Sequence, residues 1–241
     1  MSALNGFIRS AVLSWVVEAA RRGLEKLDPF VNLAYSQDGE DMILRRLFEG
    51  KRDGFYVDVG AHDPYRFSNT CYFHRLGWRG INIEPNPEAI ARFLRHRPLD
   101  TNVCVGVSEH QGTLLYYFFN DPALNTFDEA LAQERIRLPG YHLVSTKSVP
   151  VRRLDELLAE NLPKGQDIAF LSIDVEGLDL SVLRSNDWSR FRPRILLVEA
   201  RERKFRALED PISEFARRAG YDLIAKTVNT LIFEDGLASV R

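Results

Sequence analysis

Two acidic side chains stand in short apolar runs, where each can face a ligand. Asp58 lies in the run of residues 55–59, which closes at Gly60, and Glu84 ends the run of residues 80–84. An acid after a second strand, about 20 or more residues beyond a glycine turn, can accept hydrogen bonds from both ribose hydroxyls of a nucleoside. The spacing predicts a nucleoside-binding site, and an ordinary strand-turn-helix segment is the alternative.

The turn after the first run carries a single glycine. Dinucleotide sites hold pyrophosphate against backbone amides in a G-x-G-x-x-G pattern. Here Gly60 is followed by Ala61 and then by a His-Asp-Pro sequence, and Asp58 would add negative charge beside a phosphate. S-adenosylmethionine has no phosphate, and its ammonium and sulfonium groups both favour a nearby carboxylate. The turn therefore favours S-adenosylmethionine, with a nicotinamide-dependent oxidoreductase as the weaker alternative.

A second pair of acids follows a later apolar run. Residues 168–173 predict a buried strand, and Asp174 and Glu176 come directly after it. Residues two apart in an extended segment point to the same side, and two acids at the end of a central strand need a polar partner. They can hold a ligand's ammonium group, act as a general base or bind a divalent cation. The alternative is an acidic helix N-terminus that only balances the helix dipole.

His62 is the histidine best placed for chemistry, because it follows the glycine turn. It can line the ligand pocket or act as a base near neutral pH, or it can be an ordinary turn residue. The five histidines form no H-x-x-x-H or H-x-H pair, and the two cysteines are far apart. We therefore predict no metal site, although Asp174 and Glu176 leave room for a divalent cation.

Six short motifs occur in order between about residues 35 and 235. They are SQDGED (36–41), FYVDVGA (55–61), GWRGINIEP (77–85), VRRLD (151–155), IDVEG (173–177) and NTLIF (229–233). The ordered set resembles the FkbM family of S-adenosylmethionine-dependent methyltransferases. One departure concerns the first turn, where the family often has Asn-x-Gly after Gly-Ala and this chain has His62-Asp63-Pro64.

This resemblance implies a class I methyltransferase fold and the methylation of hydroxyl groups. Members of the family are associated with polyketide antibiotics and with sugars of surface polysaccharides and glycolipids. The resemblance also implies that Asp174 faces the reacting centre. The cofactor-binding residues that it implies are Asp58, Gly60 and Ala61 at the methionyl part, Glu84 at the ribose, Ser108 near the adenine, and Gln37.

We thus predict an S-adenosylmethionine-dependent O-methyltransferase. Its acceptor is expected to be a small molecule or a glycan, with the hydroxyl on a sugar of a surface glycan, a glycolipid or a natural product. An alcohol is a poor nucleophile near neutral pH, so a base within hydrogen-bond reach helps. We expect Asp174 to be this base, then Glu176, then His62. A catalytically inactive binding subunit with the same fold is the main alternative.

The order of the elements indicates the fold class. Strands and helices alternate from residue 36 onward, which predicts a Rossmann-like α/β domain with a mostly parallel seven-stranded sheet. A hairpin at residues 221–233 adds an antiparallel strand, and the domain is expected to span residues 35–241. The predicted helices are 36–48, 69–76, 88–97, 154–160, one from 178 and 211–219, and the predicted strands are 55–59, 80–84, 102–107, 168–173 and 193–199.

An insertion separates the third and fourth of these strands. Residues 113–119 predict an aromatic strand in a hairpin, residues 121–141 a partly helical stretch, and residues 148–151 a short strand. Loops beyond the edge of a sheet often carry specificity. We therefore expect residues 120–148 to form a lid that recognises the acceptor.

Residues 1–34 lie outside the resemblance and predict an amphipathic helical extension. Leu4, Phe7, Ile8, Ala11 and Trp15 recur at three- and four-residue steps. The apolar face can pack on the main domain, on a second subunit in a homodimer or on a membrane surface. No stretch has the roughly 20 apolar residues of a transmembrane span, and a formal net charge of −2 gives no steering toward nucleic acid. We expect a cytoplasmic protein.

Overall fold

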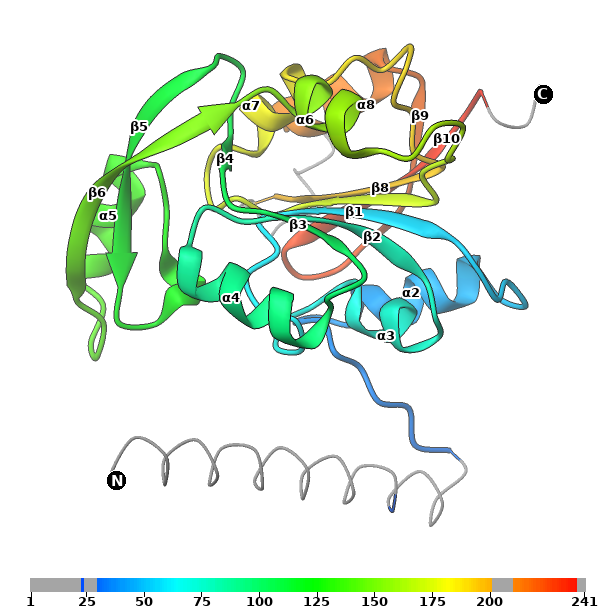
Figure 1. The fold of residues 1–241 in the computed structure, drawn as a ribbon, viewed down its shortest axis with the longest axis horizontal. Coiled ribbons are helices and arrows are strands. Elements are labelled where there is room, and N and C mark those ends of the chain that lie inside the picture. The colour runs from blue at the N-terminus through cyan, green and yellow to red at the C-terminus, as the bar shows by residue number, and fades with distance from the viewer. Residues whose placement is uncertain (1–22, 24–29, 201–209, 238–241) are drawn as a thin grey trace. The chain divides into compact units, whose positions relative to one another are not determined.

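The computed structural model describes residue 23, residues 30–200 and residues 210–237 (Figure 1). The chain divides into two units, residues 1–34 and residues 35–241. The amphipathic helix expected in the first unit falls almost wholly outside the described residues, and its packing stays a prediction. Among the residues that are described, no helix combines the length and the apolar character that a membrane span requires.

A seven-stranded sheet forms the centre of the second unit. The strand order is β3-β2-β1-β7-β8-β10-β9, in which β10 runs antiparallel to both of its neighbours and the remaining pairs are parallel. This arrangement confirms the predicted Rossmann-like sheet. The strands are β1 (Phe55–Val59), β2 (Arg79–Ile83), β3 (Thr101–Val103), β7 (Phe170–Ile173), β8 (Ile195–Glu199), β9 (Tyr221–Lys226) and β10 (Thr230–Asp235).

Helices cover both faces of this sheet. Figure 1 shows α2, α3 and α4 on one face and α6, α7 and α8 on the other. The first group is α2 (Glu40–Leu47), α3 (Cys71–Arg75) and α4 (Pro87–His96), and the second is α6 (Leu154–Asn161), α7 (Asp179–Arg184) and α8 (Pro211–Arg218). Two layers of helices around a parallel sheet leave the carboxyl ends of the strands as the natural place for a ligand.

The alternation of side chains in β1 assigns each residue to one layer. Val57 and Val59 pack in the core that includes residues of α6, α7 and α8. Tyr56 points the other way, into an aromatic core with Phe73 and Trp78. Because side chains two apart share a face, Asp58 lies on the same side as Tyr56. The strand therefore carries an acid toward the layer of α3 and α4.

The third predicted strand, residues 102–107, is divided between two sheets. β3 ends at Val103, and the next segment, β4 (Gly106–Val107), pairs with a separate three-stranded sheet of order β4-β6-β5. Gly106 lies opposite Val151 of β6, and a Cβ on Gly106 would approach Phe127 to 2.6 Å. Residues 106–152 form an outer segment beside the main sheet. The chain leaves the main sheet here because Gly106 lets it fit closely against the rest of this segment.

The outer segment replaces the predicted insertion with defined elements. β5 (Gly112–Phe119) pairs with β6 (Leu143–Arg152), which is longer than the predicted strand 148–151. Between them lie the short 3-10 helix η1 (Pro122–Leu124) and α5 (Glu129–Ile136). The first predicted helix also changes, because Gly39 adopts a left-handed φ of 88° and α2 begins only at Glu40.

Candidate functional site

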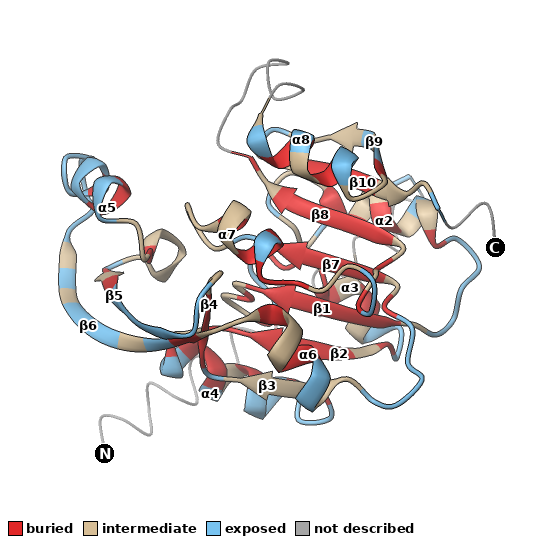
Figure 2. Ribbon diagram, turned by 90° about the horizontal axis from the view of Figure 1, so that it is seen from above, coloured by how far each residue is buried: buried red, intermediate tan, exposed pale blue. Residues whose placement is uncertain are grey.

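A cleft opens at the carboxyl ends of β1, β2 and β7, where the sequence places the ligand. It contains about 840 Å³ of empty space, part of which is open to solvent. Figure 2 shows that the arrowheads of β1, β7 and β8 point toward the outer sheet, which stands beside this edge. The predicted residues that line the cleft are Gln37, Asp58, Gly60, Ala61, His62, Glu84, Asp174 and Glu176.

Ser108 is the one predicted residue that the structure does not bring to the cleft. Its hydroxyl lies 3.3 Å from the hydroxyl of Ser181, and its N–H donates to the carbonyl of Arg152 at 3.0 Å. Its neighbour Val107 lines the cleft instead. The expected position assumed one continuous third strand, and the departure of β4 into the outer sheet turns Ser108 toward α7.

Gly60 lets the ends of two strands come together. Its φ is 81°, and a Cβ at this position would lie 1.7 Å from the backbone oxygen of Asp174. The N–H groups of Gly60 and Ala61 both donate to the carbonyl of Ile83, at 2.9 and 3.2 Å. A side chain would therefore separate β1 from β7. The glycine is needed for the strand ends to meet and not for contact with a phosphate.

Glu84 is a buried carboxylate with both oxygens held by backbone donors. Its Oε2 accepts the N–H of His62 at 3.0 Å, and its Oε1 accepts the N–H of Asn86 at 2.9 Å. Burial raises its pKa to about 7, and these two hydrogen bonds act in the opposite direction. Each carboxylate oxygen accepts more than one hydrogen bond, so a ligand can still donate to both of them.

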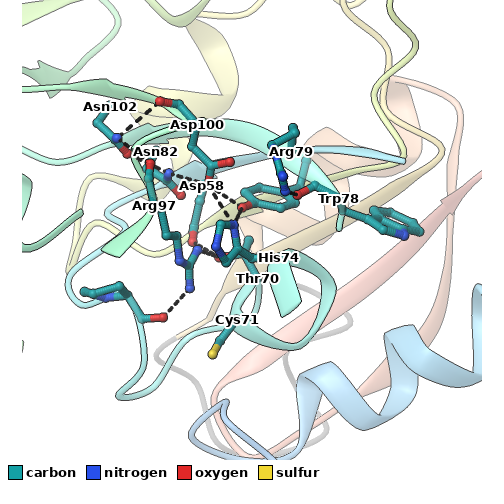
Figure 3. Close-up of polar contacts among 12 residues, drawn as sticks. Asp58, Thr70, Cys71, His74, Trp78, Arg79, Asn82, Arg97, Asp100 and Asn102 are labelled. Carbon is teal, nitrogen blue, oxygen red and sulfur yellow. Dashed lines mark hydrogen bonds and ion pairs between the residues drawn. The ribbon is translucent and has the colours of Figure 1, made fainter. Parts of the chain in front are cut away.

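Asp58 is buried beside Glu84 and is bonded on its far side. Its Oδ2 accepts the hydroxyl of Thr70 at 3.0 Å. Figure 3 places Arg97 in the same polar cluster, and the Arg97 Nη1 donates to the Thr70 hydroxyl at 2.7 Å. Burial raises the pKa of Asp58 to about 6, and the positive charge of Arg97 is the largest influence that lowers it. The cleft thus contains two acids that ionise only slightly below neutral pH or close to it.

Three residues of the cleft hold an unfavourable backbone conformation. Among the described residues, the non-glycine residues with positive φ are His62 (52°), Phe67 (57°) and Glu176 (56°), and all three line the cleft. The ring of His62 stacks near that of Phe67, with centroids 6.4 Å apart. Within the described structure the buried His62 Nε2 has no hydrogen-bond partner, and burial lowers the pKa of this histidine. Neutral His62 therefore offers a polar atom to a ligand.

Three carboxyl groups meet at the end of the cleft next to β7 and β8. Asp174, Glu176 and Glu199 each place an oxygen within 4.8 Å of the others. Asp174 is exposed to the cleft. Its pKa is nevertheless raised well above the usual range, first because protein atoms around the carboxyl displace water and then because of the negative charge of Glu199. Burial and the nearby acids raise the pKa of Glu199 to about 8. Like charges this close cannot all be ionised, so the cluster can share a proton or hold a divalent cation.

Glu176 differs from Asp174 because it is tied to the outer segment. It forms an ion pair with Arg135 of α5, and its backbone oxygen accepts the hydroxyl of Thr126 at 2.7 Å. Asp174 forms no ion pair with any of the described residues. The structure therefore assigns Glu176 a position between the main sheet and the outer segment and leaves Asp174 facing the cleft.

The outer segment supplies a second wall that the sequence did not specify by residue. Pro122, Asn125 and Phe127 from the expected lid, together with Tyr116 of β5, line the cleft. The rings of Tyr116 and Phe127 have centroids 4.4 Å apart. Burial raises the pKa of Tyr116 well above its usual value, so its hydroxyl is neutral.

The sequence analysis did not predict Glu199 as a site residue, although its position at the end of a strand indicates it. It ends the fifth predicted strand, as Glu84 ends the second and Asp174 follows the fourth. The same rule about the carboxyl ends of parallel strands places it beside Asp174. The residues of the second wall had no comparable signal, because their position depends on how the outer segment folds back.

Two solved structures resemble the chain at low sequence identity. Methyltransferase FkbM from Methylobacillus flagellatus KT matches with a TM-score of 0.50 and 16% identity, over 83% of this chain and 48% of that protein. The chain thus spans about half the length of that protein, and the likeness supports the fold alone. A TehB-like SAM-dependent methyltransferase from Corynebacterium glutamicum ATCC 13032 Kitasato has a TM-score of 0.39 and 13% identity, over 90% of this chain and 97% of that protein. Among curated proteins, none matches the sequence significantly.

A family model gives the assignment. The model described as the Methyltransferase FkbM domain matches residues 58–223, which is more than half of the chain. The match begins at Asp58 and includes Gly60, Glu84 and Asp174, so it covers the strand ends that build the cleft. It also agrees with the ordered motifs of the sequence. The chain therefore belongs to the family of FkbM methyltransferases.

Proposed function

We propose that this methyltransferase uses S-adenosylmethionine and transfers the methyl group to a hydroxyl of a sugar, in a surface glycan, a glycolipid or a natural product. The observation that carries the proposal is the convergence of Asp58, Glu84 and Asp174 in one cleft. Carboxyl groups at three strand ends suit a cationic nucleoside and oppose a pyrophosphate.

The donor groups of the cleft fit this cofactor. Glu84 has lone pairs left for two ribose hydroxyls after accepting from His62 and Asn86. The carboxylate of Asp58 can offset the positive charge of the cofactor's ammonium and sulfonium groups. The Nε2 of His62, which has no hydrogen-bond partner within the described structure, can bond a polar atom of the ligand. When bound, S-adenosylmethionine supplies an electrophilic methyl group on a sulfonium centre.

The acid cluster provides the proton acceptor. An alcohol must lose its proton as its oxygen bonds to the methyl carbon, and Asp174 faces the cleft without a cation partner among the described residues. Its raised pKa makes the ionised form a stronger base than an ordinary carboxylate and lets it keep the proton it accepts. Glu176 is held by Arg135, so it serves mainly to fix the outer wall beside the acceptor.

The second wall supports a polyhydroxylated acceptor. Tyr116 and Phe127 offer aromatic rings, and Asn125 and Asn69 offer amide groups around the same cleft. A mixture of aromatic rings and polar groups can bind both the carbon framework and the hydroxyls of a sugar. Specificity for the acceptor would then reside in β5, η1 and the loop before α5.

Binding and transfer can be measured separately. Calorimetry should show binding of S-adenosylhomocysteine that NAD does not compete with, and NAD binding in its place would remove the cofactor assignment. Radiolabelled S-adenosylmethionine should then label a hydroxyl in a panel of sugars and lipid-linked glycans, and Asp174→Asn should not support this labelling. Cofactor binding without transfer to any hydroxyl in the panel would favour the inactive binding subunit.

A further inference from the structure

Arg97 is a buried cation behind the cleft. It follows α4 and is only 1% exposed. Its guanidinium donates to the hydroxyls of Thr70 and Ser68, at 2.7 and 3.1 Å, and to the carbonyl of Pro64. Within the described part of the chain, no carboxylate lies at ion-pair distance from it. A buried charge without a direct counterion is costly, so its placement needs a reason.

The hydroxyl of Thr70 connects Arg97 to Asp58. Arginine can only donate hydrogen bonds, so the Thr70 oxygen must be the acceptor in its contact with Arg97. The single proton of that hydroxyl is then directed to the Asp58 Oδ2, 3.0 Å away. The Thr70 hydroxyl also lies 3.2 Å from the hydroxyl of Ser68, but the charge of an ionised Asp58 makes its carboxylate the stronger acceptor of the Thr70 proton. Both hydrogen bonds favour the ionised form of Asp58. Figure 3 shows the three side chains in this order.

The other groups around Asp58 act against its charge. Asp100, in the turn after α4, raises the pKa of Asp58 by its negative charge. Glu84, which follows β2, also interacts with Asp58 through charge. Arg97 is thus the cation that balances Asp58 against burial and against neighbouring acids. The bonds of Arg97 to Pro64 and Ser68 also hold the loop that carries His62.

We propose that Arg97 is a positioning residue for Asp58: acting through the Thr70 hydroxyl, its buried guanidinium keeps the Asp58 carboxylate ionised and fixed at the wall of the cleft. The link to cofactor binding rests on the proposed function, while the link to the charge of Asp58 does not. Arg97 itself is not among the residues that line the cleft.

The charge of Asp58 can be followed without any ligand. In protein labelled with ¹³C at the aspartate carboxyls, the signal of Asp58 is identified by its loss in Asp58→Asn. In the wild type it should titrate near pH 6. Thr70→Val interrupts the connection, and Arg97→Met removes the charge. Either change should move the midpoint upward by about one pH unit or more.

Two variants separate this effect from a general disturbance. Thr70→Ser keeps the hydroxyl and should restore the wild-type midpoint. Ser68→Ala removes another partner of Arg97 and the 3.2 Å contact between the Ser68 and Thr70 hydroxyls. It leaves the contacts of Thr70 with Arg97 and Asp58, so it should leave the midpoint in place. An unmoved midpoint in Thr70→Val, or an equal shift in Ser68→Ala, would overturn the proposal. If Arg97→Met fails to fold, Thr70→Val decides the question.

S-adenosylhomocysteine is the probe for the functional consequence. Its affinity for Thr70→Val should fall about threefold or more at pH 6.5 and differ less than twofold from the wild type at pH 8.5. A purely structural loss would be the same at both pH values and would overturn the consequence for binding. If the wild type does not bind this probe while the Asp58 midpoint still shifts, the proposed function fails and the role of Arg97 stands.

Discussion

Replacing Glu84 by glutamine should separate ligand binding from stability at one position. The change keeps the size of the side chain and removes its charge. Glu84 is 5% exposed, and burial raises its pKa from 4.5 to about 7. Its two oxygens accept the backbone N–H groups of His62 and Asn86. The wild-type carboxylate is therefore both costly to bury and well oriented.

The sign of the stability effect follows from the raised pKa. A carboxyl that binds its proton more tightly in the folded state contributes stability that is present at low pH and is lost as the pH rises through about 7. The change from 4.5 to about 7 corresponds to roughly 3 kcal/mol. Glutamine avoids this cost, although one of the two N–H donors then faces an amide NH₂, at about 1–3 kcal/mol.

These magnitudes predict that Glu84→Gln gains stability relative to the wild type as the pH rises. Between pH 5 and pH 8 the difference in unfolding free energy should shift in favour of the variant by about 2–3 kcal/mol. Binding should change in the other direction. Loss of charge-assisted bonds to the ribose hydroxyls, at about 1.5–3 kcal/mol, weakens S-adenosylhomocysteine binding tenfold or more.

Urea unfolding at both pH values and calorimetry at pH 8 measure the two effects. The exposed acid Glu88 offers a matched control, because Glu88→Gln should alter neither quantity. Wild-type affinity in a folded Glu84→Gln protein would remove Glu84 from the ligand site. A stability difference that does not change with pH would refute the argument from burial.

Four further changes test the cleft and the N-terminal residues. Gly60→Ala places a Cβ 1.7 Å from the Asp174 oxygen at a φ of 81°, so it should lower the melting temperature by several degrees and abolish S-adenosylhomocysteine binding; unchanged binding would contradict this. Asp174→Asn should lower kcat by ~10²–10⁴ with nearly unchanged cofactor affinity. Glu199→Gln should move the rise of kcat with pH to lower pH, because a carboxyl that raises the pKa of Asp174 is gone. If this rise stays at the wild-type pH, Asp174 is excluded as the base. Deleting residues 1–34 should leave cofactor affinity intact, since the cleft is lined by residues from Gln37 onward, and sedimentation should show a changed oligomeric state or solubility.

The fold could be predicted because its signals are local. The strands β1, β2, β7 and β8 are short, mostly apolar runs, and a helix follows each of them in the chain. The final hairpin predicts the antiparallel strand. The division of residues 102–107 between β3 and β4 could not be predicted in this way. After Asn102 that run has no polar or charged residue that would mark a break, and its end at Val103 is decided by the pairing of Gly106 with Val151, a partner far away in the sequence.

The part of the site that could be predicted consists of the residues at the strand ends. Asp58, Glu84 and Asp174 come together because parallel strands bring their carboxyl ends to one edge. Tyr116 and Phe127 reach the same cleft through the outer segment, and no local pattern fixes how that segment folds back. Ser108 shows the same limit, because it was expected at the cleft from its place after the third strand, and the chain changes sheets just before it.

Three residues of the cleft have a backbone conformation that their residue types do not favour. A positive φ suits glycine or asparagine, and at other residues it costs on the order of 1 kcal/mol or more. Here it falls on His62, Phe67 and Glu176, all in the cleft. For His62 and Glu176 the bonds that hold the backbone are those that orient the acids: the N–H of His62 donates to Glu84, and Arg135 and Thr126 hold Glu176. The backbone strain at these two residues is therefore offset by the same contacts that fix the carboxylates, which is why sequence preference alone fails there.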